Sequence, residues 1–203
     1  MPELTMISPL LNGMTDPELW SSHEGTSVYR VRHESTGLYF IVKHISVPES
    51  AETTDILVEQ GIIPAFNQAS DYYKSIVEQY RKELVQFHTL SQAPNICSCL
   101  RFQVVQKADQ PGFDMYLLSP CRTSLLDFLH DVTISRKTAI QIGIDLCNAL
   151  IVLRQNGFIH QNVKPENIFL EKGKFVLSGF GLADVATLQH TAIAKPYVGC
   201  FSA

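Results

Sequence analysis

The residue types best suited to chemistry gather in one stretch near the end of the 203-residue chain. The stretch reads His160-Gln161-Asn162, then Lys164 and Asn167, and later Gly179-Phe180-Gly181. The amide of Asn162 cannot accept a proton as a carboxylate can, and an asparagine such as Asn167 is a poor sole ligand for a hard dication. The stretch is therefore poorly equipped for proton transfer or for holding Mg²⁺, although it is rich in polar groups.

This stretch resembles the catalytic loop and the metal-binding loop of a protein kinase, which read His-Arg-Asp, four residues, Asn, and then Asp-Phe-Gly. Asn162 stands where that family has its catalytic aspartate, and Gly179 stands where it has the aspartate that chelates Mg²⁺. General-base help of this kind is worth roughly 10²–10⁴-fold in rate. Lys164 matches the family pattern, and so does Asn167 as a partial metal ligand. The resemblance implies a kinase frame without its two chemical carboxylates.

Lys43 and Glu83 match the ion pair that positions the nucleotide phosphates in protein kinases. Taken singly, Lys43 would suit a solvated strand and Glu83 a solvated helix face. Because the rest of the frame is present, the resemblance favours the ion pair. The interval between these two residues exceeds the usual one, so residues of about 48–70 are expected to form an insertion.

The resemblance also places Val28, Ile41 and Leu118 around a nucleotide pocket. Ile41 stands where the family has a small alanine above the adenine, and its extra carbons should crowd a purine. Leu118, or a residue one position away from it, is predicted to guard the pocket at the hinge between the lobes. The positions of the family's three phosphate-loop glycines all carry side chains here, namely Ser21, His23 and Thr26.

His160, Phe180 and Phe87 match the stack of side chains that couples the two lobes of a kinase. Hydrophobic spacing and turn residues also predict the kinase order of elements. The expected strands cover 27–32, 38–45, 96–106 and 113–119, and the expected helices cover 71–90, 123–130 and 135–156. Thr133 or Ser135 is expected to cap the last helix, and Gly157 is expected to end it.

The resemblance therefore implies an α+β, bilobal, kinase-like fold. Residues 1–20 are predicted to be an irregular lead-in, because Pro2, Pro9, Gly13 and Pro17 interrupt them. Residues 21–118 would form the N-lobe. Residues 119–203 would form part of the C-lobe and end in the activation segment.

Composition excludes several other classes of function. A net charge of −4 provides no basic field for nucleic acid or for an anionic membrane. No stretch approaches the roughly 20 apolar residues that span a bilayer, and the start lacks the features of a signal peptide. The five cysteines are irregularly spaced, which favours free thiols in a reducing cytosol over a disulfide framework or a zinc site. The sequence thus indicates a cytoplasmic protein.

The functional expectation is a catalytically impaired pseudokinase that acts as a binding or regulatory module in signalling. The alternative is a weakly active, ATP-dependent serine/threonine protein kinase. ATP binding is expected to be weak and Mg²⁺ binding poorer still. A protein partner or a further C-terminal region is expected to cover the apolar surface of the 135–156 helix.

Overall fold

The structure is a computed structural model that describes residues 9–23, 25–160 and 163–178. The chain forms two compact units. The first contains residues 1–88 and 98–121, and the second contains residues 89–97 and 122–203. Residues 89–97, which the sequence analysis places in the N-lobe, thus belong to the second unit. The antiparallel sheet and the helices confirm the α+β, kinase-like fold.

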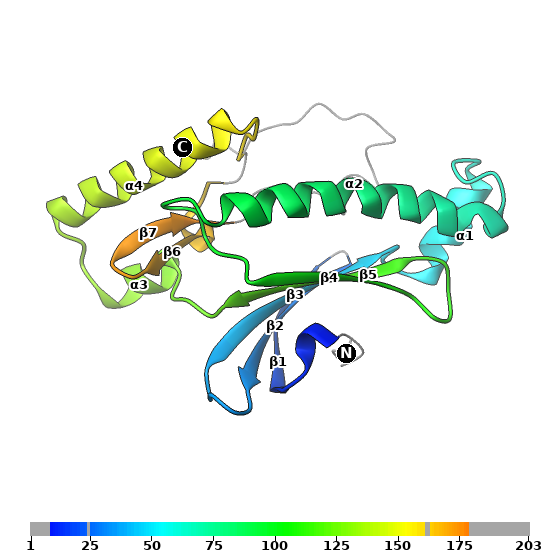
Figure 1. The fold of residues 1–203 in the computed structure, drawn as a ribbon, viewed down its shortest axis with the longest axis horizontal. Coiled ribbons are helices and arrows are strands. Elements are labelled where there is room, and N and C mark those ends of the chain that lie inside the picture. Colours follow the sequence, from blue (N-terminus) through cyan, green and yellow to red (C-terminus); the bar gives the residue numbers. More distant parts are fainter. Residues whose placement is uncertain (1–8, 24, 161–162, 179–203) are drawn as a thin grey trace. The chain divides into compact units, whose positions relative to one another are not determined.

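The first unit is built on a five-stranded antiparallel sheet with the order β1-β2-β3-β5-β4 (Figure 1). Its strands are β1 (Met14–His23), β2 (Thr26–His33), β3 (Tyr39–Val47), β4 (Arg101–Gln106) and β5 (Phe113–Pro120). The expectation that residues 1–20 are irregular is wrong from Met14 onward. Pro17 is tolerated because β1 is an edge strand and its pairing with β2 shifts register between Thr15 and Glu18.

One face of this sheet, which we call the Val42 face, carries a compact apolar core. Directly paired residues of neighbouring strands share a face, so the pairs Tyr29–Val42 and Val42–Leu118 lie together. Leu11, from the short helix η1 (Pro9–Leu11), packs into this core together with Met14. The opposite face, which contains Lys43 and is called the Lys43 face, also carries Val28 and Ile41.

The predicted insertion contains a helix, α1 (Ala51–Glu59), whose first turn is capped by the hydroxyl of Ser50. Helix α2 (Ala69–Leu90) follows, and a buried hydrogen bond of 3.0 Å between the hydroxyls of Thr54 and Tyr73 joins the two helices. Figure 1 shows α2 running along the sheet, on the side opposite η1. Its apolar stripe is buried at Tyr73, Val77, Tyr80 and Leu84, which recur with the spacing of one helical face.

The second unit contains α3 (Leu125–Asp131), α4 (Arg136–Gln155) and the hairpin of β6 (Ile168–Glu171) and β7 (Lys174–Leu177). The hydroxyl of Ser135 accepts a hydrogen bond from the Thr138 N–H at 3.1 Å and so caps α4, as predicted. Gly157 follows the end of α4 with a φ of +82°, which confirms the predicted left-handed stop.

Strand β7 is held by hydrogen bonds from α4 and from the segment 89–97. The buried carboxylate of Asp145, on α4, accepts hydrogen bonds from the Phe175 N–H at 2.9 Å and from the Gln141 side chain at 3.0 Å. The Asn95 side chain donates to the Phe175 carbonyl at 3.0 Å. These bonds fix the hairpin that leads into Gly179. Within the described ranges, no helix has the length and apolarity needed to cross a bilayer.

Candidate functional site

The residue just before Gly179 is held by both ends of the candidate catalytic loop. His160 Nε2 lies 2.8 Å from the carbonyl oxygen of Ser178, and the Ser178 N–H donates to the carbonyl of Asn167 at 2.8 Å. Ser178 therefore lies between the two ends of the His160-to-Asn167 segment. Ser178 is not among the predicted site residues, although its place directly before the Gly-Phe-Gly motif was a usable signal.

Several predicted residues fall outside the described part of the chain. Residues 161–162 and 179–203 are not described, so the predictions for Asn162, Gly179 and Phe180 lie there. The side chains of Glu83 and Phe87 are also outside the description, although both residues belong to α2. The predicted pairing of Lys43 with Glu83 and the predicted side-chain stack therefore stay predictions.

The protonation state of His160 follows from its surroundings. Its side chain is buried, and burial lowers its pKa from the ordinary value of 6.5, while the hydrogen bond to Ser178 raises the pKa by a smaller amount. A carbonyl oxygen can only accept a hydrogen bond, so Nε2 must carry the proton. His160 is thus a neutral donor at pH 7 that anchors the segment before Gly179.

The other described loop residues lie on or beside a single 3-10 turn, η3 (Pro165–Asn167). Lys164 and Glu166 are exposed, and Asn167 is partly buried. Among the described residues, no group of three or more His, Cys, Asp or Glu side chains could hold a metal ion. Mg²⁺ is usually held by one or two carboxylates together with phosphate oxygens and water, and Asn167 is the described residue that the resemblance assigns to it as a partial ligand.

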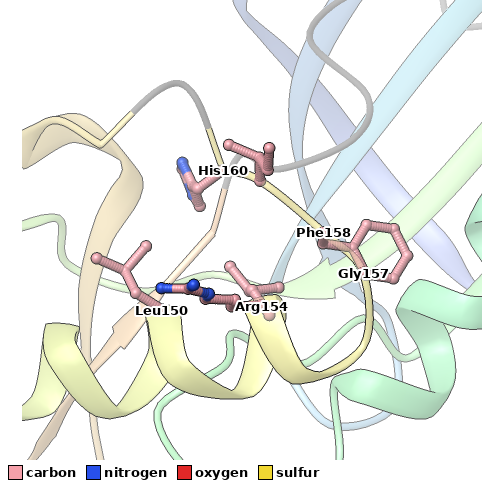
Figure 2. A pocket seen from close by; sticks show the side chains of 7 residues that line it. Leu150, Arg154, Gly157, Phe158 and His160 are labelled. Atoms are coloured by element: carbon pink, nitrogen blue, oxygen red, sulfur yellow. The ribbon is translucent and has the colours of Figure 1, made fainter.

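A hollow of about 580 Å³ lies beside His160, at the end of α4 (Figure 2). Leu150, Leu153 and Arg154 line it from the helix, and residues 157–160 line it from the following loop. Lys164 and Asn167 do not belong to the lining residues. The hollow is largely apolar and does not bring the predicted loop residues together.

The register of the first unit brings three of the predicted nucleotide residues to one face. Val28 is directly opposite Lys43, and Ile41 lies two residues from Lys43 on the same strand. Side chains alternate between faces along a strand, so all three lie on the Lys43 face. Lys43 is opposite Leu117, whereas Leu118 is opposite Val42 and is buried in the core on the other face. The register does not bring Leu118 to Lys43 and places Leu117 there instead.

Lys43 lies in a poorly hydrated environment. Burial lowers its pKa from 10.5 to about 8, because desolvation disfavours the charged amine. At pH 7 most of the Lys43 side chains still carry a proton. The residue can therefore offer a positive charge to an anionic group on this face, but a smaller fraction of it is protonated than of an ordinary lysine.

Similarity to known proteins identifies the family to which this geometry belongs. The model of the protein kinase domain matches residues 24–200. A probable serine/threonine-protein kinase of Clostridium perfringens is 31% identical over 123 residues, which are 58% of this chain and 17% of that protein. The serine/threonine-protein kinase PknB of Mycolicibacterium smegmatis is 42% identical over 62 residues, which are 30% of this chain and 10% of that protein. The chain thus spans less than a fifth of the length of these two relatives.

Proposed function

This chain belongs to the protein kinase family, and on that premise we propose that it is a catalytically impaired member. In this proposal the chain is a pseudokinase domain that serves as a binding or regulatory module in signalling. One observation carries the proposal: Asn162 and Gly179 stand where the family has the aspartates that take up the substrate proton and chelate Mg²⁺. Neither replacement can perform the chemistry of a carboxylate.

The surrounding frame supports a structural role for the loop. Ser178 is bound by His160 and Asn167, and β7 is fixed by Asp145 and Asn95. These contacts hold the chain on both sides of the loop without using any group that would react. A domain that keeps its frame while losing its reactive groups can still present a fixed surface to a protein partner or to another region of the same protein.

Weak nucleotide binding is part of the same proposal. Lys43 could meet phosphates on the Lys43 face, but Ile41 adds branched carbons on that face where the family has a small residue. Asn167 would then be the partial ligand for Mg²⁺, and no carboxylate at position 179 assists it. ATP, where it binds, would serve as a structural ligand rather than as a phosphoryl donor.

The experiment that tests the proposal is a phosphoryl-transfer assay with radiolabelled ATP and Mg²⁺, using the whole protein alone and with basic, acidic and neutral serine/threonine peptides. Lys43→Ala is the matched variant, because it removes the phosphate contact that a working kinase would require. We expect equal background incorporation for both proteins. Incorporation that depends on both Mg²⁺ and Lys43 would overturn the proposal.

The second candidate function is a weakly active, ATP-dependent serine/threonine kinase. The retained Lys43, Lys164 and Asn167 favour it, and so do the names of the two bacterial relatives. It predicts that Mg²⁺-ATP at millimolar concentration raises the melting temperature, because a ligand that binds the folded state stabilises it by mass action. No shift, together with no transfer, would leave the pseudokinase proposal standing alone.

A further inference from the structure

Arg30 lies at the centre of an exposed cluster on the first three strands of the sheet. Its guanidinium carbon lies 5.4 Å from the centre of the Trp20 ring and 4.9 Å from the centre of the Tyr39 ring. A carboxylate oxygen of Glu18 lies 2.5 Å from a guanidinium nitrogen. Trp20 and Tyr39 are each 48% exposed, so much of both rings remains open to solvent. We call these four residues the Arg30 cluster.

The strand register places the Arg30 cluster beside the candidate nucleotide residues. Arg30 is directly opposite Ile41, and Tyr39 lies two residues before Ile41 on β3, so both share the Lys43 face. Trp20 precedes Ser21, which is opposite Val28, and its ring meets the Arg30 guanidinium on this face. Residues two apart on a strand are separated by roughly 7 Å. The Arg30 cluster therefore lies next to Val28 and Ile41, and a single aromatic ligand is large enough to contact both.

An exposed arginine can lie on the surface without any role in binding, because single surface ion pairs and exposed cation–π contacts are common. Three contacts from two other strands converge on Arg30, however, and together they keep its planar group against both rings. A guanidinium is planar, carries delocalised charge and stacks on aromatic rings much as a heteroaromatic base does. Arg30 therefore supplies from within the chain the kind of group that a purine would present to these rings.

We propose that the Arg30 guanidinium occupies the aromatic surface of Trp20 and Tyr39 and so closes this part of the Lys43 face to purine bases. Glu18 holds the guanidinium in the closing position. This proposal rests on the proposed weak nucleotide binding. It attributes that weakness to the Arg30 side chain in addition to the bulk of Ile41. Moving Arg30 away would leave two exposed rings next to Val28 and Ile41, on which a purine can stack.

Trp20 provides the measurement, because it is the one tryptophan in the 203-residue sequence. We would titrate the fluorescence of the full chain with adenosine and with ATP, without Mg²⁺, in the parent protein and in Arg30→Ala. A Trp20→Phe version of each protein isolates the Trp20 signal. Glu18→Gln releases Arg30 without shortening it. Arg32→Ala is the charge-matched control, since Arg32 lies on the same strand and its guanidinium borders the turn at Gly37.

We expect no saturable quenching in the parent or in Arg32→Ala, and saturable quenching by both ligands in Arg30→Ala. The Kd of Arg30→Ala should then lie at least about tenfold below the highest ligand concentration at which the parent remains unsaturated. Glu18→Gln should give a smaller change in the same direction. Each titration is repeated with Ile41→Ala. If Ile41→Ala alone binds adenosine and ATP more tightly, and adding Arg30→Ala brings no further gain, then Ile41 closes the face. That result would overturn the inference. Equal binding by the parent and Arg30→Ala would overturn it as well.

The outcomes for this inference and for the proposed function are separate. Saturable Trp20 quenching in the parent, without phosphoryl transfer, would overturn the closing role of Arg30 and leave the pseudokinase proposal intact. Transfer of phosphate by the parent would overturn the pseudokinase proposal itself. Circular dichroism melting of every variant confirms folding. Because the Arg30 side chain is 37% exposed, its removal should leave the sheet intact.

Discussion

His160 donates a hydrogen bond from Nε2 to the carbonyl oxygen of Ser178 across 2.8 Å. The donor is a buried neutral imidazole, and the acceptor belongs to the residue directly before Gly179. This bond joins the first residue of the His160–Asn167 segment to the residue that precedes Gly179. The frame of a kinase is thus held by a group whose protonation state affects the stability of the fold.

The first prediction concerns the pH dependence that His160 introduces. Its folded pKa lies below the ordinary 6.5, so at pH values well above 6.5 the imidazole is neutral in both the folded and the unfolded chain. As the pH falls from 6.5 through the folded pKa, the unfolded chain binds a proton first, and the free energy of unfolding falls. Urea unfolding between pH 7.5 and 5 should show this loss in the parent but not in His160→Gln.

His130 supplies the control for this measurement, because it is exposed in the last turn of α3. His130→Gln keeps His160, so its free energy of unfolding should fall from pH 7.5 to 5 as that of the parent does. Parallel pH curves for the parent and for His160→Gln would contradict the role given to His160.

The second prediction concerns Lys43, whose folded pKa is about 8 against an ordinary value of 10.5. Between these two values the unfolded chain keeps a proton that the folded chain has lost, so the free energy of unfolding rises with pH. The rise, relative to Lys43→Met, should reach about 3 kcal/mol at most. Chemical denaturation from pH 7.5 to 10.5 measures it.

Lys74→Met, at an exposed position of α2, is the matched control for Lys43→Met. It keeps Lys43, so its free energy of unfolding should rise with pH as that of the parent does. If Lys43→Met follows the parent just as closely, the amine of Lys43 is not desolvated in the folded chain.

The third prediction concerns the buried carboxylate of Asp145. Asp145→Ala leaves the Phe175 N–H without its acceptor in the interior, which should lower the free energy of unfolding by about 1–3 kcal/mol. Asp145→Asn keeps one acceptor oxygen and should lose less. Glu166→Ala, at an exposed position, should change stability by no more than about 0.5 kcal/mol. Equal effects of Asp145→Ala and Glu166→Ala would sink this prediction.

The fourth prediction restores the missing carboxylates. Asn162→Asp combined with Gly179→Asp should produce phosphoryl transfer that requires Mg²⁺ and exceeds the parent by at least about 10²-fold. Each single change should give less, because one restores the base and the other restores the metal ligand. The assay is transfer of radiolabel from ATP to peptide. A double variant as inactive as the parent would locate the impairment elsewhere, for example on the Lys43 face.

Much of this molecule was predictable from local sequence. The cap at Ser135, the stop at Gly157 and the helical stripe of α2 depend on residues within a few positions of one another, so the pattern alone indicates them. The kinase-like order of elements follows from the same local signals. The absence of carboxylates at positions 162 and 179 is a matter of residue identity and needs no coordinates.

Only the tertiary structure decided which side chains share a face. Leu118 and Leu117 are equally apolar in the sequence, and the pairing of β3 with β5 places Leu117 opposite Lys43. Side chains alternate with a period of two, so a shift of one residue exchanges the faces, and strands distant in the chain set that shift. The meeting of Trp20, Arg30 and Tyr39 depends on three paired strands for the same reason. The sequence thus determined which reactive groups are absent, and the sheet register decided what covers the face beside Lys43.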